Sequence, residues 1–216
     1  MGTIVNERIV DYINSLDKGN SPVCNAIEKE ALADGVPIIR KEMGNLLKVL
    51  LLLKQPQKIL EVGTAVGYSS ILMSENMPQN CRITTIENYE KRIPVAKNNF
   101  KRAGKEEVIT LLEGDAMDIL KELDGTYDFI FTDAAKGQYI NFLPELLRLM
   151  PAGGLLISDN VLQEGDIVES RYGVTRRNRT IHTRMREYIY TLTHAEQLET
   201  SIVPIGDGIT LSVKKG

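Results

Sequence analysis

The sequence predicts an α/β fold in which helices cover both faces of a mostly parallel sheet. Short apolar runs of strand length alternate with helical patterns between residues 58 and 158, and the connections between them are short. Strand and helix units of this length imply right-handed crossovers between parallel strands. The last two strand patterns are joined only by residues 204–208, which permit a hairpin but no helical crossover. We therefore expect seven strands, with one antiparallel strand near the C-terminus.

The composition is that of one globular domain. The chain has 216 residues, 43% hydrophobic and 25% charged, which suffices for one sizeable core. The longest apolar block, residues 46–53, is too short to span a membrane. Cys24 and Cys81 lie far apart in no metal-binding motif, so we expect buried thiols in a reducing compartment. We expect a cytoplasmic protein without membrane association.

The N-terminal part is predicted to form helices that precede the sheet. Apolar residues recur at helical spacing near the N-terminus, and Ser21-Pro22 provides a helix cap followed by a first-turn proline. The predicted helices here span residues 4–16, 22–32 and about 41–54. We take residues 1–36 as a helical extension and 37–216 as the core of a single domain, 1–216.

Strands and helices then alternate along the core. Glycines close two of the helical patterns, Gly104 the first and Gly125 the second. The predicted strands span residues 59–62, 82–87, 108–113, 127–132, 154–158, 198–203 and 209–213. The predicted helices begin at Tyr68 and then span residues 89–103, 116–123, 139–150 and 181–193.

The first strand runs into a glycine-bracketed turn, residues 61–67, that opens a helix. Backbone N–H groups at such a helix N-terminus bind nucleotide-like ligands. A dinucleotide fold carries G-x-G-x-x-G, whereas Gly63 and Gly67 stand without a third glycine to approach a pyrophosphate. We infer an adenosine-type ligand without a diphosphate, of which S-adenosylmethionine is the common one.

Acidic residues mark the ends of the five predicted parallel strands, where ligands bind in such sheets. They are Glu61, Glu87, Asp115, Asp133 and Asp159. Glu87 follows Gly67 by twenty residues, a distance that suits hydrogen bonds to ribose hydroxyls. Asp115 and Ala116, after the third strand, are placed to hold the adenine edge.

Asp133, Asp159 and Asn160 form a candidate metal site. Three oxygen ligands from two strand ends suit a hard divalent cation, with Mg²⁺ first and Mn²⁺ or Ca²⁺ as alternatives. Such a cation lowers the pKa of a hydroxyl that binds it. Lys136 follows Asp133 by three residues and is a candidate proton acceptor, with a structural ion pair to Asp133 as the alternative.

Four blocks of sequence together resemble the metal-dependent caffeoyl-CoA and catechol O-methyltransferase family. They are residues 61–69, 128–139, 153–160 and 204–211. The resemblance runs from about residue 37 to the end of the chain. It implies a Rossmann-like class I methyltransferase fold and S-adenosylmethionine-dependent methylation of an acceptor hydroxyl. Members of the family are usually dimers, so we also expect a homodimer.

The resemblance also assigns roles to individual positions. It implies that Asp133, Asp159 and Asn160 hold the metal and that Lys136 is the base. We therefore predict that Asp133 and Lys136 are the catalytic residues. The resemblance and the motifs together predict the residues that contact the cofactor. They are Ile39, Glu61, Gly63, Thr64, Ser69, Glu87, Asp115, Ala116 and Asp133.

Residues 171–186 carry six arginines and no acidic residue, in a chain whose formal net charge is −3. Arginine suits bidentate phosphate contacts, whereas a solvated loop and helix face is the alternative. The candidate RNA-binding residues are Arg171, Arg176, Arg177 and Arg179. A polyanionic acceptor would need such a patch, whether RNA or a coenzyme A thioester. Within the family, the chain looks most like bacterial enzymes that convert 5-hydroxyuridine at wobble position 34 of tRNA to 5-methoxyuridine.

We therefore predict an S-adenosylmethionine- and Mg²⁺-dependent O-methyltransferase that acts on the tRNA anticodon loop. A small catechol, phenolic or CoA-ester acceptor on the same site is the alternative, and a non-catalytic cofactor-binding protein is the third class. Another basic row is predicted to be a solvated helix face, with an extension of the RNA-binding track as the alternative. It contains Lys91, Arg92, Lys97, Lys101 and Arg102.

Overall fold

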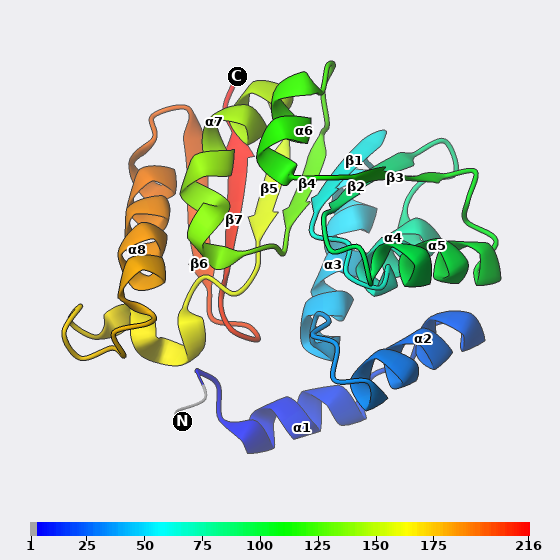
Figure 1. Cartoon of the computed structure of the whole chain (residues 1–216), viewed down its shortest axis with the longest axis horizontal. Helices are drawn as coiled ribbons and strands as arrows, with labels where there is room; N and C mark the ends of the chain where they lie inside the picture. Colours follow the sequence, from blue (N-terminus) through cyan, green and yellow to red (C-terminus); the bar gives the residue numbers. More distant parts are fainter. Residues whose placement is uncertain (1–3) are drawn as a thin grey trace.

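The computed structural model describes residues 4–216 and contains a seven-stranded sheet (Figure 1). The strands are β1 Lys58–Val62, β2 Arg82–Glu87, β3 Ile109–Glu113, β4 Phe129–Thr132, β5 Leu155–Ser158, β6 Leu198–Val203 and β7 Ile209–Lys214. Their order across the sheet is β3-β2-β1-β4-β5-β7-β6, and β7 runs antiparallel to both of its neighbours. The predicted fold class and the antiparallel strand near the C-terminus are confirmed.

Helices cover both faces of this sheet. They are α1 Glu7–Ser15, α2 Pro22–Ala33, α3 Lys41–Lys54, α4 Tyr68–Asn76, α5 Ile93–Arg102, α6 Ala116–Glu122, α7 Tyr139–Leu149 and α8 Arg179–His194, with 3₁₀ helices η1 Lys136–Gln138 and η2 Gln163–Val168. The prediction that α5 begins at Tyr89 was wrong by four residues. The Glu87 carboxylate accepts the backbone N–H groups of Asn88 and Tyr89, which holds this segment in a turn ahead of the helix.

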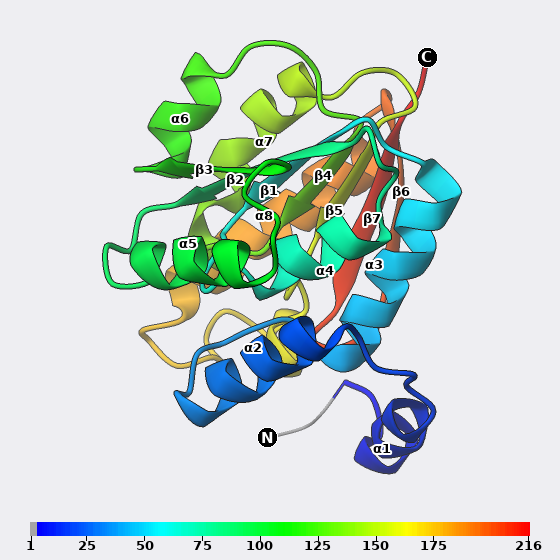
Figure 2. The same cartoon turned by 90° about the vertical axis from the view of Figure 1, so that its right-hand side faces the viewer.

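Each face of the sheet has its own hydrophobic core, because neighbouring residues of a strand point to opposite faces. Ile59 and Phe131 pack on the face covered by α3, α4 and α5, whereas Leu60 and Ile130 pack on the face covered by α6, α7 and α8. Figure 2 shows the sheet between α6 and α7 on one side and α3, α4 and α5 on the other, with α1 and α2 below. The strands' carboxyl ends are thereby held in one rigid edge.

Helix α1 packs least against the rest of the chain. It has no buried residue, and its residues Ile9, Tyr12 and Ile13 are exposed, as is its C-cap Leu16. A homodimer would find an apolar face here, and the homodimer stays a prediction. Among residues 4–216, no helix combines the length and the apolarity needed to cross a membrane.

Candidate functional site

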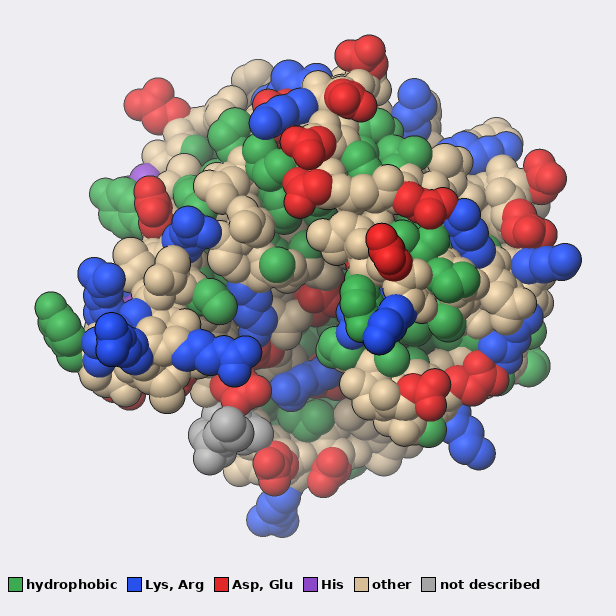
Figure 3. Space-filling view, viewed as in Figure 1, with side chains coloured by type: hydrophobic (Ala, Val, Ile, Leu, Met, Phe, Trp, Pro, Cys, Tyr) green, Lys and Arg blue, Asp and Glu red, His purple; other side chains and the backbone are tan. Residues whose placement is uncertain are grey.

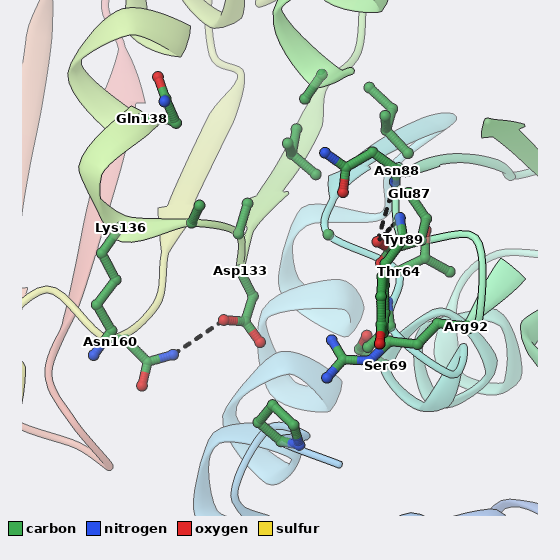
Figure 4. Close-up of a pocket in the computed structure, with 18 of the residues that line it drawn as sticks. Thr64, Ser69, Glu87, Asn88, Tyr89, Arg92, Asp133, Lys136, Gln138 and Asn160 are labelled. Carbon is green, nitrogen blue, oxygen red and sulfur yellow. Dashed lines mark hydrogen bonds between the residues drawn. The ribbon is translucent and has the colours of Figure 1, made fainter. Parts of the chain in front are cut away.

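A cavity of about 620 Å³ lies at the carboxyl ends of the parallel strands, where the sequence places its candidate residues (Figures 3 and 4). The predicted residues that line it are Ile39, Gly63, Thr64, Ser69, Glu87, Asp115, Ala116, Asp133, Lys136 and Asn160. Glu61 and Asp159 do not line it, although both lie next to residues that do. The structure thus brings most of the predicted cofactor, metal and catalytic residues to one cavity, whereas none of the four predicted RNA-binding arginines lines it.

The glycine-bracketed turn shapes one wall of this cavity. Gly63 has φ of 102°, and a Cβ atom there would lie 2.0 Å from the backbone oxygen of Asp133. The N–H groups of Gly63 and Thr64 both donate to the Ile86 carbonyl. Only glycine permits this backbone conformation together with this approach of the β1 end to the β4 end. The turn therefore opens beside Asp133.

Glu61 supports the turn from beneath. Its carboxylate is fully buried and accepts hydrogen bonds from the hydroxyls of Ser69, Ser70 and Thr85. Burial raises the pKa of Glu61 to about 7, although the three hydroxyl donors favour its charged form. Its predicted direct contact with the cofactor stays a prediction, and the structure gives it the role of positioning Ser69.

This buried carboxyl group gives the stability a pH dependence. The pKa of Glu61 is about 7 in the folded chain against an ordinary 4.5, so the folded state holds the proton more tightly. The free energy of unfolding should therefore fall as the pH rises from about 4.5 through 7. We expect urea unfolding to show that the free energy of unfolding falls between about pH 5 and pH 8 in both proteins. The fall should be about 2 to 3 kcal/mol smaller in Glu61→Gln than in the parent. Parallel losses in the two proteins would contradict this assignment.

Glu87 organises the second wall. One carboxylate oxygen accepts the Ala65 N–H at 2.7 Å, and the other accepts those of Asn88 and Tyr89 at 3.1 and 2.9 Å. A carboxylate has about four lone-pair positions, so one is left for a ligand. That remaining capacity fits the predicted hydrogen bond to a ribose hydroxyl.

Asp133, Asp159 and Asn160 come together at the ends of β4 and β5. The side-chain amide of Asn160 donates to the Asp133 carboxylate at 3.0 Å, and its backbone N–H donates to the Asp159 carboxylate at 2.7 Å (Figure 4). Burial raises the pKa of both carboxyl groups, and the charge of Asp133 raises that of Asp159 further. The buried Asp159 carboxylate and the half-buried Asp133 carboxylate thus share one small site.

Within residues 4–216, no group of three or more His, Cys, Asp or Glu side chains is arranged to hold a metal ion. The candidate set at Asp133 instead combines two carboxylates with one amide. These are hard oxygen donors of the kind that Mg²⁺ binds. Asn160 also has a left-handed backbone, with φ of 61°, a conformation that non-glycine residues adopt at functional sites.

Lys136 forms an ion pair, but its partner is not the predicted Asp133. Its ammonium nitrogen lies 2.9 Å from the carboxylate of Asp207, which is 6% exposed and also accepts the Glu164 N–H. The alternative of a pair with Asp133 was therefore wrong. The ion pair holds the Lys136 ammonium nitrogen beside Asp207, and the role of Lys136 as proton acceptor stays a prediction.

Asp207 was not predicted as a site residue, because residues 204–208 indicate only the short link of a hairpin. Strand β7 inserts between β5 and β6, and this order carries the preceding turn to the β5 end beside Lys136. The available signal was the acidic residue inside the fourth resembling block, residues 204–211.

The arginine segment, defined as Arg171, Arg176, Arg177 and Arg179, precedes or begins α8. The first three side chains are exposed, and Arg179 lies over the Tyr172 ring at 5.6 Å. Figure 3 shows Lys and Arg side chains gathered at the lower left, over the segment between η2 and α8. The guanidinium of Arg184 donates to the Gly137 carbonyl at 3.0 Å, so α8 is attached to η1 next to Lys136.

Comparisons with known proteins agree with this geometry. A family model described as O-methyltransferase matches residues 25–215. The chain is 34% identical over 175 residues to "Catechol O-methyltransferase" of Niastella koreensis, with 78% of this chain and 79% of the relative covered. It is 34% identical over 182 residues to "Caffeoyl-CoA O-methyltransferase 2" of Populus trichocarpa, with 78% and 71% covered.

Solved structures show the same fold. The O-methyltransferase TomG of Streptomyces achromogenes, whose structure was solved in complex with S-adenosylmethionine, superimposes with a TM-score of 0.85 and 25% identity over 97% of this chain and 96% of that one. The relatives named for catechol and caffeoyl-CoA favour the small-acceptor alternative over the tRNA prediction.

Proposed function

Because the chain belongs to the O-methyltransferase family and uses S-adenosylmethionine, we propose that its acceptor is a catechol-type compound and that a divalent cation assists the transfer. The observation that carries this proposal is the placement of Asp133, Asp159 and Asn160. They lie at the ends of β4 and β5, next to the glycine turn of the cofactor cavity.

The donor set fits a hard divalent cation. Burial raises the pKa of the carboxyl groups of Asp133 and Asp159, and Lys136 is paired elsewhere, so these two groups lack a dedicated cationic partner among the described residues. When bound, Mg²⁺ would supply positive charge that favours the ionised form of an acceptor hydroxyl. The Asn160 amide would turn its oxygen toward the ion, an orientation that exchanges the amide's two ends.

The chain's own residues supply positioning. The turn at residues 63–67 and the Glu87 carboxylate hold the adenosyl end of the cofactor, while Ser69 lies above the buried Glu61. Lys136, fixed by Asp207, adds a cation on the acceptor side of Asp133. Holding the sulfonium methyl group against one acceptor oxygen provides most of the rate enhancement in such a reaction.

A catechol-type acceptor accounts for the two relatives' names as well as for the site. Catechol and the caffeoyl group both carry two neighbouring hydroxyls, and two oxygens on adjacent carbons bind a hard cation better than one. The expected product is a monomethylated catechol.

The arginine segment supports a second acceptor, the tRNA wobble nucleotide 5-hydroxyuridine. This base also presents a hydroxyl beside a carbonyl oxygen, and the exposed arginines that precede α8 would contact the flanking phosphates. The exposed Tyr172 ring, in contact with Arg179, adds a surface on which an unpaired base would stack.

The acceptor is tested by mass spectrometry of products. The protein is incubated with labelled S-adenosylmethionine and Mg²⁺, together with a catechol, a monohydroxy phenol, a caffeoyl thioester or tRNA that carries 5-hydroxyuridine. We expect label on the catechol and the caffeoyl thioester and little on the phenol. Equal labelling of phenol and catechol would contradict the proposal, and labelling of tRNA alone would replace it with the second acceptor.

Charge reversal in the arginine segment separates the two acceptors. The triple variant Arg171→Glu, Arg176→Glu and Arg177→Glu should leave kcat/KM for a catechol within about twofold, because these exposed side chains lie outside the cavity. If tRNA is an acceptor, its kcat/KM should fall at least about tenfold and its salt dependence should weaken. Unchanged tRNA methylation would contradict a role of the segment in RNA binding.

A further inference from the structure

We infer that Arg92 binds the carboxylate of the cofactor's methionine end and forms a carboxylate subsite in the cavity. This inference deepens the cofactor half of the proposed function and does not depend on the identity of the acceptor. Arg92 is a positioning residue in this scheme, because it holds the end of the cofactor that does not react.

The position of Arg92 differs from what the sequence predicts. Its basic neighbours suggest a solvated helix face, and Lys91 is indeed exposed. Arg92 itself is half-buried, lies at the N-cap of α5 and lines the cavity. Figure 4 shows its guanidinium extending beside Ser69 toward the side of the cavity that holds Asp133.

The backbone around Arg92 is fixed by the cofactor site itself. The Arg92 N–H donates to the Tyr89 carbonyl at 2.8 Å, and the Tyr89 N–H in turn donates to the Glu87 carboxylate. The guanidinium carbon lies 5.3 Å from the centre of the Tyr89 ring, an arrangement that supports a cation above an aromatic face. The same acid that is placed to bind ribose therefore also places Arg92.

In the part of the chain that the structure describes, no carboxylate forms an ion pair with the Arg92 guanidinium. The other cation that lines the cavity, Lys136, is by contrast paired with Asp207. An arginine that faces a cavity and forms no ion pair is available for an anionic group of a ligand, and its planar fork suits a carboxylate.

The ligand chemistry identifies that group. S-adenosylmethionine carries a sulfonium and an ammonium as cations, and its carboxylate is its only anion. Figure 4 shows Thr64 and Ser69 on one side of Asp133, which is the proposed cofactor side, and Asn160 and Lys136 on the other, which is the proposed acceptor side. Arg92 reaches the cofactor side, so the cofactor carboxylate is the anion within its reach.

The test compares two ligands on four proteins. Isothermal titration calorimetry measures Kd for S-adenosylmethionine and for its decarboxylated form, which keeps the sulfonium, the amine and the adenosyl group. The proteins are the parent, Arg92→Met, Arg92→Lys and the matched control Lys91→Met, which removes one exposed positive charge next to the cavity. No acceptor is present, so failure of the proposed acceptor would not affect this measurement.

We expect Arg92→Met to weaken S-adenosylmethionine about 10- to 100-fold and to leave the decarboxylated form within about threefold. Lys91→Met should leave both ligands within about twofold. Arg92→Lys should recover part of the lost affinity, because it restores the charge but not the bidentate geometry. Equal weakening of both ligands by Arg92→Met, or no weakening of either, would overturn the inference. Thermal unfolding of the ligand-free variants checks that each is folded.

Discussion

Replacing Asp133 by asparagine should lower kcat for methylation of a catechol by about a thousandfold or more, a loss of about 4 kcal/mol of transition-state stabilisation. The substitution keeps the shape of the side chain but removes one of the two carboxylates beside Asn160. It removes charge from both the proposed cation site and the cofactor side of the cavity. The measurement is steady-state kinetics together with titration of Mn²⁺ binding.

The control for this variant is Glu113→Gln, which removes one negative charge from the exposed end of β3. Glu113 pairs with Lys97 on the surface and does not line the cavity. Its kcat should stay within about twofold of the parent. If Asp133→Asn kept more than about a tenth of the parent's kcat, the proposed role of the carboxylate would be wrong.

Gly63→Ala should destabilise the fold by about 3 kcal/mol and weaken S-adenosylhomocysteine binding at least about 100-fold. Its Cβ atom would meet the Asp133 backbone oxygen at 2.0 Å and the carbonyl carbon at 2.8 Å, and neither is a flexible side chain. The β1–α4 turn must then move away from the end of β4. Urea unfolding and calorimetry measure the two effects.

Gly153→Ala separates this clash from backbone strain. Gly153 also has a positive φ, 74°, but nothing lies within 4 Å of the Cβ atom that alanine would add. We expect a cost of about 1 to 2 kcal/mol and unchanged ligand affinity. If both alanine variants behaved alike, the close approach of the two strand ends would have no special importance for the cofactor.

The fold and the location of the site were predictable because they rest on local patterns. The hydrophobic periodicity of the strands and helices predicts the fold class, and the short link before Ile209 predicts the antiparallel strand. Acids at strand ends such as Glu87 and Asp133 meet because parallel strands share one carboxyl edge. These features need no knowledge of which strands are neighbours.

The misplaced residues depend on contacts that no local pattern encodes. Arg92 left the predicted helix face because the Glu87 carboxylate captures two backbone N–H groups and delays the start of α5. Lys136 pairs with Asp207 because β7 lies beside β5, an order that the sequence does not specify. Glu61 lies in β1 between the buried residues Leu60 and Val62. This position in a buried strand was the one clue in the sequence that Glu61 itself is buried.

The most direct test of the central claim is the cation dependence of acceptor choice. The protein is stripped with a chelator, and kcat/KM for a catechol and for a monohydroxy phenol is measured before and after Mg²⁺ is returned. We predict that catechol methylation falls at least about 100-fold without the cation and recovers with it, while the slow reaction of the phenol changes little. Full catechol methylation in the stripped protein, with S-adenosylmethionine still bound, would contradict the claim that Asp133, Asp159 and Asn160 act through a metal ion.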